Sequence, residues 1–194
     1  RFWDVSQGRI TIGGVDVKEI GFANVRNNVG LVLQEPFAIS ATVKENVDIG
    51  NVGYSQNEIE AICKVCEIHS EIMGFKNGYS EIVGENGITL SGGQKQRLAL
   101  ARILIKNYGL IIFDDFLSKL DVNTRANVLN NLKNNFSNLI ALHIVNDLEN
   151  LKNEDRVLFI DNKKIVDSTH ADLIKNNENY FKLYCIATNK VNNE

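Results

Sequence analysis

From residue 109 onward, short apolar runs alternate with segments whose apolar residues have helical spacing. The runs expected to form strands are 110–113, 139–145, 156–160 and 165–166, and the segments expected to form helices are 122–135, 147–152 and 171–187. Strands separated by helices are typical of crossover connections, which place the strands side by side in a parallel sheet. The sequence therefore predicts an α/β fold built on a parallel sheet.

The first half of the chain adds a hairpin and one more strand. Residues 9–12 and 15–17 flank Gly13 and Gly14, and two glycines between short strand-like runs are typical of a tight β-hairpin. Residues 29–33 form a continuous apolar run of the kind that is buried in a sheet. We therefore predict a hairpin followed by a buried strand.

The expected organisation is a sheet core interrupted by one helical insertion. Residues 55–107 have apolar positions at helical spacing, whereas strands are expected on both sides of them. We therefore expect the α/β core to comprise residues 1–51 and 108–194, and the helical subdomain to comprise residues 52–107. The composition, 44% apolar and 23% charged, is that of a globular protein that can bury such a core.

Charge, hydropathy and cysteine spacing argue against three other classes. The 24 acidic side chains outnumber the 21 basic ones, whereas nucleic-acid-binding proteins usually have a basic excess. No apolar run approaches the roughly 18 residues that a membrane-spanning helix needs. Cys63 and Cys66 form a C-x-x-C pair without a second pair beside it, and Cys185 is distant. Their apolar helical setting favours a buried structural role over a redox or zinc role.

The segment 90–97, with the sequence L-S-G-G-Q-K-Q-R, carries the strongest chemical signal. Ser91 stands where a helix begins and Gln94 follows three residues later, which is the capping-box pattern. Gly92 and Gly93 let the backbone approach a ligand closely, and the free amides and dipole of a helix N-terminus attract anions. The pattern predicts an anion-binding helix N-terminus; the alternative is an ordinary glycine-containing loop before a helix.

This string, followed by an apolar run that ends in Asp114, resembles the signature motif and the Walker B strand of ATP-binding cassette (ABC) ATPases. Further segments resemble motifs of the exporter-type cassette in the family's order: the Q-loop at Gln34, the exporter-type docking segment at 37–46, the X-loop at 82–87 and the D-loop at 118–121. The resemblance covers essentially all of residues 1–185. It implies an ABC exporter nucleotide-binding domain, with a P-loop NTPase-like (RecA-like) parallel sheet core and an inserted helical signature subdomain.

The resemblance also implies a role for each motif residue. Asp114 and Gln34 would bind Mg²⁺, and Gln34 would also contact the attacking water. Asp115 would polarise that water as the catalytic carboxylate, and Asn146 would contact the γ-phosphate of ATP. The residues that would contact a nucleotide held by a second cassette are Leu90, Ser91, Gly92, Gly93, Gln94 and Asp121.

The cofactors implied by the resemblance are ATP and Mg²⁺. The implied partners are the transmembrane domains of the same transporter and a second nucleotide-binding domain, with no nucleic acid. The implied location is the cytoplasmic face of the membrane.

Four features depart from the family pattern. The chain contains no G-x-x-x-x-G-K-[ST] loop. The resemblance places this phosphate-binding loop about ten residues upstream of Arg1. We therefore expect a cassette that is truncated at its N-terminus and inactive by itself. Asp115 replaces the usual glutamate, and a carboxylate displaced by about 1 Å can slow a reaction about 10²-fold. Asn146 aligns with the usual histidine; it can donate a hydrogen bond but carries no charge. His143, three residues earlier, is an alternative that we expect to lie within a strand, and Lys119 replaces a usual small residue.

An intact signature beside a weakened Asp115 and Asn146 leads to a specific hypothesis. In ABC dimers, the signature of one subunit completes the nucleotide site formed by the Walker motifs of the other. The site formed by the Walker motifs of this chain would therefore hydrolyse ATP slowly, whereas its signature would complete a competent site on the partner. The chain would then be the degenerate half of a heterodimeric exporter. One alternative is a non-hydrolysing cassette that acts as a structural or regulatory dimerisation module. Another is a soluble ABC ATPase of DNA repair or translation, against which the acidic balance and the segment 37–46 argue.

Overall fold

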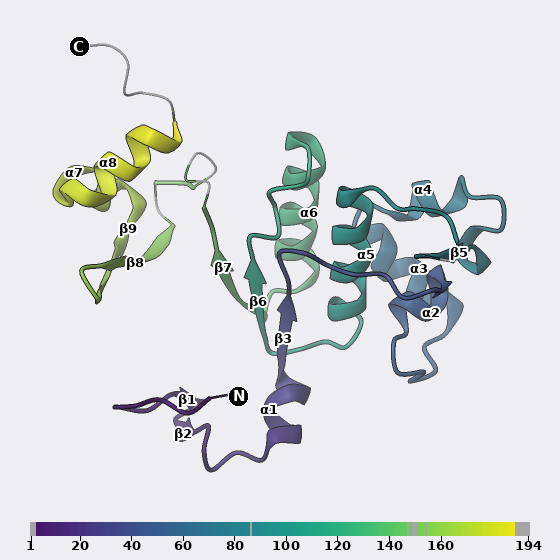
Figure 1. Cartoon of the computed structure of the whole chain (residues 1–194), viewed down its shortest axis with the longest axis horizontal. Helices are drawn as coiled ribbons and strands as arrows, with labels where there is room; N and C mark the ends of the chain where they lie inside the picture. The colour runs from purple at the N-terminus through teal and green to yellow at the C-terminus, as the bar shows by residue number, and fades with distance from the viewer. Residues whose placement is uncertain (1–2, 86, 147, 149–150, 154, 189–194) are drawn as a thin grey trace. The chain divides into compact units, whose positions relative to one another are not determined.

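A computed structural model describes residues 3–85, 87–146, 148, 151–153 and 155–188 of the chain (Figure 1). The chain divides into two compact units, Arg1–Ile144 and Val145–Glu194, each with its own apolar core. Within the described ranges, no helix is both long and apolar enough to cross a bilayer. The predicted division into an α/β core and a helical signature subdomain stays a prediction.

The first unit contains a three-stranded parallel sheet in the order β3–β6–β7 (Figure 1). Its strands are β3 (Val29–Val32), β6 (Leu110–Asp114) and β7 (Ile140–Ile144). β6 lies in the middle and has buried Ile111 and Phe113 in alternation with less buried residues. The predicted α/β fold with a parallel sheet core is therefore confirmed. Because the three strands run the same way, their carboxyl ends meet at one edge, where ligands bind in such sheets.

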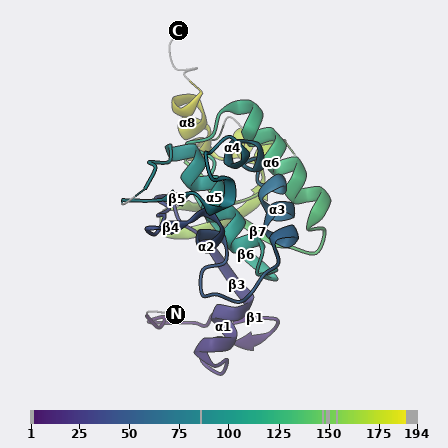
Figure 2. The same cartoon turned by 90° about the vertical axis from the view of Figure 1, so that its right-hand side faces the viewer.

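A group of short helices lies beside this sheet, on the right in Figure 1, and faces the viewer in Figure 2. Its elements are α2 (Val43–Val47), α3 (Gln56–Val65), α4 (His69–Met73), the 3-10 helix η1 (Gly78–Ser80) and α5 (Gly92–Leu104), with the antiparallel strands β4 (Ala41–Thr42) and β5 (Ile82–Val83). Complete capping boxes begin α2, α3 and α5, at Thr42, Ser55 and Ser91. Such boxes satisfy backbone amides that a helix start would otherwise leave unpaired.

The prediction of a helical region over residues 55–107 is confirmed for α3, α4 and α5 but is wrong between α4 and α5. There η1, β5 and connecting loops replace a helix. Glycines are the physical reason: Gly78 and Gly84 have φ of 54° and 96°, a left-handed backbone that cannot continue a right-handed helix. The helix α6 (Val122–Asn135) has the predicted bounds.

The N-terminal hairpin is also confirmed. Strands β1 (Thr11–Ile12) and β2 (Val15–Asp16) pair antiparallel across Gly13 and Gly14, whose φ values of 58° and 83° suit a tight turn. The helix α1 (Phe22–Asn28) then leads directly into β3. Residues Arg1 and Phe2 lie outside the described residues.

The second unit differs from the prediction in how its strands pair. β8 (Arg156–Asp161) and β9 (Lys164–Thr169) form an antiparallel hairpin rather than parallel neighbours, because Asn162 and Lys163 make a tight turn with positive φ. The predicted helix 171–187 is divided into α7 (His170–Asn176) and α8 (Glu178–Ala187). Asn177 divides it, since its backbone is extended and its side chain caps α8. Residues 147, 149 and 150 of the helix predicted over 147–152 lie outside the described residues, and residues 148, 151 and 152 are not helical.

Gly30 allows a close approach between β3 and the elements that pack on it. A Cβ atom at this position would lie 2.7 Å from Cδ2 of Tyr108 and 2.8 Å from Cγ2 of Ile103, well inside the usual contact distance. We therefore expect Gly30→Ala to lower the free energy of unfolding by about 1–3 kcal/mol. The matched control is Gly109→Ala, because no atom lies within 4 Å of its added Cβ. Equal urea midpoints for the two variants would contradict this account of the packing.

His170 gives the second unit a pH-dependent stability. Its side chain is buried, and its Nδ1 lies 2.7 Å from the hydroxyl oxygen of Tyr180. Burial lowers the pKa of His170 below its ordinary value of 6.5, while the nearby Asp155 carboxylate acts in the opposite direction. The native state therefore favours the neutral imidazole.

Because the unfolded chain binds the proton more readily, the free energy of unfolding should fall as the pH drops below about 6.5. The loss continues until the pH has passed the lower pKa of the folded state. We expect His170→Asn, which keeps a polar group near the Tyr180 hydroxyl, to show a shallower loss. Urea denaturation between pH 7.5 and pH 5 measures both slopes, and parallel slopes would count against a titrating His170.

Candidate functional site

Two of the predicted site residues meet at the carboxyl edge of the parallel sheet. Gln34 follows the end of β3 by two residues, and Asp115 directly follows β6. Nε2 of Gln34 donates a hydrogen bond to Oδ2 of Asp115 at 3.2 Å, although 81 residues separate them in the sequence. Asp114, the last residue of β6, is half-buried at the same edge. The structure thus places Gln34, Asp114 and Asp115 in one neighbourhood.

The backbone of Asp115 is held from two sides. Its amide donates to the carbonyl of Ile144 at the end of β7 (2.9 Å), and its carbonyl accepts from Oγ of Ser118 (2.9 Å). Its φ of 45° lies in the left-handed region, which aspartate tolerates better than most residues. Because the backbone is held in this way, the length of the side chain limits how far the carboxylate can reach.

The oxygens at this edge suit a magnesium ion. Mg²⁺ prefers oxygen ligands and usually takes one or two carboxylates together with waters and substrate phosphates. Asp114 supplies a carboxylate, and the Gln34 amide keeps its Oε1 available because Nε2 is used by Asp115. The donor set therefore fits the ion that the sequence predicts.

The two remaining candidates at β7 differ in their settings. His143 lies within β7, as expected, and stacks on Phe113 with the ring centroids 4.5 Å apart and an interplanar angle of 11°. This places His143 in the packing of the sheet. Asn146 follows the end of β7 by two residues, is exposed and belongs to the second unit.

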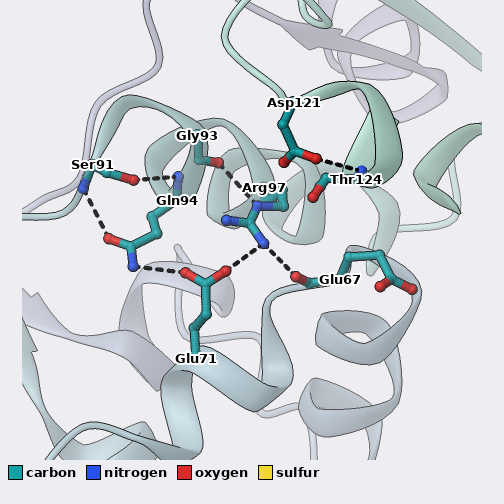
Figure 3. Close-up of polar contacts among 8 residues, drawn as sticks. All are labelled: Glu67, Glu71, Ser91, Gly93, Gln94, Arg97, Asp121 and Thr124. Carbon is teal, nitrogen blue, oxygen red and sulfur yellow. Dashed lines mark hydrogen bonds and ion pairs between the residues drawn. The ribbon is translucent and has the colours of Figure 1, made fainter. Parts of the chain in front are cut away.

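The signature motif forms the N-terminus of α5 (Figure 3). Oγ of Ser91 accepts from the amide of Gln94 at 3.2 Å, and Oε1 of Gln94 accepts from the amide of Ser91 at 2.8 Å. Ser91 and Gly92 are exposed, so this end of the helix faces outward. Leu90 is buried in the core. The predicted capping box at Ser91 is confirmed.

The two signature glycines also pack against the segment 118–121. A Cβ atom on Gly93 would lie 3.2 Å from the carbonyl oxygen of Lys119, and one on Gly92 would lie 3.4 Å from the Lys119 side chain. The sequence suggested that these glycines let a ligand approach; the structure adds a close approach of the chain to itself. The segments that resemble the signature and the D-loop are therefore in contact.

Asp121 begins α6 as its N-cap. Its Oδ1 accepts from the amides of Asn123 and Thr124 at 3.1 Å and 3.0 Å. The pKa of Asp121 lies below its ordinary value, mainly because its carboxylate accepts a hydrogen bond from the side chain of Thr124 and, to a smaller extent, one from the amide of Thr124. The carboxylate is therefore engaged in capping.

Two groups of contacts that hold α5 in place were not predicted from the sequence. At its N-terminal end, Glu71 of α4 contacts both Gln94 and Arg97 (Figure 3). Near its C-terminal end, the buried Arg102 donates to the main-chain carbonyls of Asn46 (2.8 Å) and Phe37 (3.2 Å). Neither group has a local sequence signal, because the partners are 23 to 65 residues apart.

The cysteine pair is buried, as predicted. Cys63 and Cys66 are both inaccessible to solvent, and Cys185 is half-buried. Burial raises the pKa of the Cys63 thiol to about 11 and also raises that of Cys66. Both thiols are therefore protonated, and thus poor nucleophiles, at neutral pH.

Comparison with known proteins gives one consistent answer. A family model described as "ABC transporter" matches residues 2–118. The putative multidrug export ATP-binding/permease protein YgaD of Bacillus subtilis is 34% identical over 187 residues, covering 96% of this chain and 32% of that protein. ABC transporter B family member 4 of Dictyostelium discoideum is 37% identical over 184 residues, covering 94% of this chain and 24% of that protein.

A solved structure agrees with these relatives. The structure of a bacterial Atm1-family ABC exporter with ATP bound matches with a TM-score of 0.90 and 30% sequence identity, over 100% of this chain and 34% of that chain. The chain belongs to the ABC transporter family, as a nucleotide-binding domain of the exporter type. It spans about a third or less of the length of these proteins.

The contact between the signature and Lys119 predicts opposite effects for two neighbouring substitutions. Gly92→Ala should be neutral or stabilising by up to about 1 kcal/mol, because alanine favours a helix and only a flexible side chain lies near. Gly93→Ala should lower the free energy of unfolding by about 1 kcal/mol, because the new methyl group would press on a backbone carbonyl. Urea denaturation of the two variants checks the difference, and the reverse order of stability would refute it.

Proposed function

We propose that the chain is the ATP-binding cassette of an ABC exporter, and the degenerate half of a heterodimer. In this function a cassette dimer couples ATP binding and hydrolysis to transmembrane export. The observation that carries the proposal is a contrast between two motifs. The signature helix is fully capped and exposed at Ser91, whereas the shorter carboxylate of Asp115 stands on a backbone that hydrogen bonds hold on both sides.

On the sheet edge, the chain's residues would prepare a water molecule for attack on ATP. The Gln34 amide holds Oδ2 of Asp115, which leaves Oδ1 to accept a proton from the water. Asp114 and Gln34 would hold Mg²⁺, which when bound neutralises charge on the phosphates. Asn146 would donate a hydrogen bond to the γ-phosphate.

On the signature side, the chain would complete the site of a second cassette. The hydroxyl of Ser91 and the free amides of Gly92 and Gly93 would face the partner's nucleotide, where the helix dipole favours negative charge. Gln94 would hold Ser91 in place through the capping box. Leu90 and Asp121 would contribute through their main chains, since the side chain of one is buried and that of the other caps α6.

The proposed organisation and partners follow the family. Residues 1–51 and 108–194 would form the ATP-binding core, and residues 52–107 the signature subdomain. The transmembrane domains of the same transporter would dock on the segment 37–46, on the cytoplasmic face of the membrane. We expect the chain by itself to bind ATP weakly, because its sequence contains no G-x-x-x-x-G-K-[ST] loop for the phosphates.

A second candidate function is a non-hydrolysing cassette that serves as a structural or regulatory dimerisation module. The fixed backbone of Asp115 favours it, because a shortened carboxylate on a rigid support does not recover its reach. The two candidates differ in one measurable property, which is whether residue 115 limits ATP turnover.

In the complete transporter with its second cassette, we expect Asp115→Glu to raise ATP turnover at the site that contains residue 115 by about 10- to 100-fold. The added methylene restores the reach of the carboxylate without changing its charge. The matched control is Asp115→Asn, which keeps the side-chain size and should abolish turnover at that site. Steady-state phosphate release, with the other site blocked, measures the effect. Turnover that is absent in both the wild type and the glutamate variant would favour the non-hydrolysing cassette instead.

A further inference from the structure

Glu71 lies outside every motif that the sequence identified, yet both of its carboxylate oxygens contact the signature helix (Figure 3). Oε2 accepts a hydrogen bond from Nε2 of Gln94 at 2.7 Å, and Oε1 forms an ion pair with Arg97 at 2.7 Å. Glu71 belongs to α4, whereas Gln94 and Arg97 belong to α5. One carboxylate thus joins the first turn of the signature helix to a neighbouring helix.

The contact with Gln94 fixes the orientation of a side chain that has two tasks. The Oε1 atom of Gln94 accepts from the amide of Ser91, and its Nε2 donates to Glu71. Both ends of the carboxamide are therefore used, and a flipped amide would place like groups together at both contacts. Glu71 consequently holds Gln94 in the orientation that closes the capping box.

The closed capping box determines how Ser91 presents its hydroxyl group. Oγ accepts from the amide of Gln94, so the hydroxyl proton stays available for donation to a ligand. Ser91 is exposed, and Gly92 and Gly93, whose amides lie beside it, are the first two residues of the helix. The position of these donors therefore depends on the Gln94 carboxamide, and through it on Glu71.

The contact with Arg97 adds an electrostatic support beneath the same turn. Arg97 is nearly buried, and it also donates to the carbonyls of Gly93 and Glu67. Without Glu71, its guanidinium would keep carbonyl partners but lose the carboxylate that balances its charge. A buried charge without a counter-charge is costly, so the helix turn would shift or loosen to reach solvent.

We propose that Glu71 is a positioning residue for the signature motif. It holds Ser91, Gly92 and Gly93 in the arrangement that meets the phosphates of a nucleotide on the second cassette, acting through Gln94 and Arg97. This inference rests on the proposed function for its consequence on ATP turnover, but the positioning itself can be measured independently.

The first measurement is amide hydrogen exchange in the full-length protein, without nucleotide. We expect Glu71→Ala to raise exchange of the Ser91 and Gln94 amides about 10-fold, because both amides bond within the capping box. Glu71→Gln, which keeps an acceptor for Gln94 but loses the ion pair, should give an intermediate rate. The control is Glu60→Ala, because Glu60 lies on α3 and accepts a hydrogen bond from Gln56 of the same helix. Unchanged exchange in Glu71→Ala would overturn the proposal, whatever the ATP turnover.

The second measurement is ATP turnover by the complete transporter, at the site that the signature of this chain completes. We expect Glu71→Ala to lower kcat about 10-fold while the KM for ATP changes less than about two-fold, because the second cassette supplies most of the ATP contacts. Adding Glu71→Ala to Gln94→Ala should lower kcat by a smaller factor than Glu71→Ala lowers it in the wild type, since Glu71 acts partly through Gln94 and partly through Arg97.

The outcomes separate the two proposals. Additive losses in the double variant, or a rise in KM with unchanged kcat, would overturn the positioning role. A wild-type transporter that turns over no ATP would instead refute the proposed ATPase function, and the exchange rates would still decide the role of Glu71.

Discussion

The burial of α5 is the constraint on which most of the first unit depends. Leu98, Leu100 and Leu104 are almost completely buried, and each such side chain contributes roughly 1.5–3 kcal/mol through the hydrophobic effect. The same helix carries the signature at its N-terminus and Arg102 near its C-terminus. Because Arg102 bonds to the main chain of the segment 37–46, a displacement of α5 would move the signature and this segment together. In the proposed function, this connection would link the nucleotide contacts of the signature to the docking segment 37–46.

The sheet edge depends on a different constraint, the position of β6 between β3 and β7. The parallel register brings the ends of the strands level, so that Gln34 after β3 and Asp115 after β6 come within hydrogen-bonding distance. The bond from the Asp115 amide to Ile144 continues the pairing with β7 beyond the last strand residue. The sheet thus fixes the position of the Asp115 backbone, and the length of the side chain limits how far the carboxylate reaches from it.

In the proposed function, the two halves of the site would depend on these constraints in different ways. The signature side would act through backbone amides and one hydroxyl, whose positions follow from helix capping in this chain. The sheet edge would act through the length and charge of the Asp115 side chain, where an aspartate replaces the family's usual glutamate. We propose that this asymmetry lets the chain complete the site of a more competent partner. The chain covers 32% of the multidrug export relative from Bacillus subtilis and 24% of the relative from Dictyostelium discoideum, so both proteins are about three times longer or more.

Local patterns in the sequence by themselves determined the strands of the parallel sheet, the capped start of α5 and the bounds of α6. These features follow from apolar spacing, capping residues and glycines within a few positions of one another. The antiparallel pairing of β8 with β9 was missed because an apolar run does not specify which strand pairs with it, although the turn at Asn162 and Lys163 that sets the pairing is local. Only the tertiary structure decided the meeting of Gln34 with Asp115 and of Glu71 with Gln94. These contacts join residues far apart in the chain, and they exist only because several buried elements pack in one arrangement.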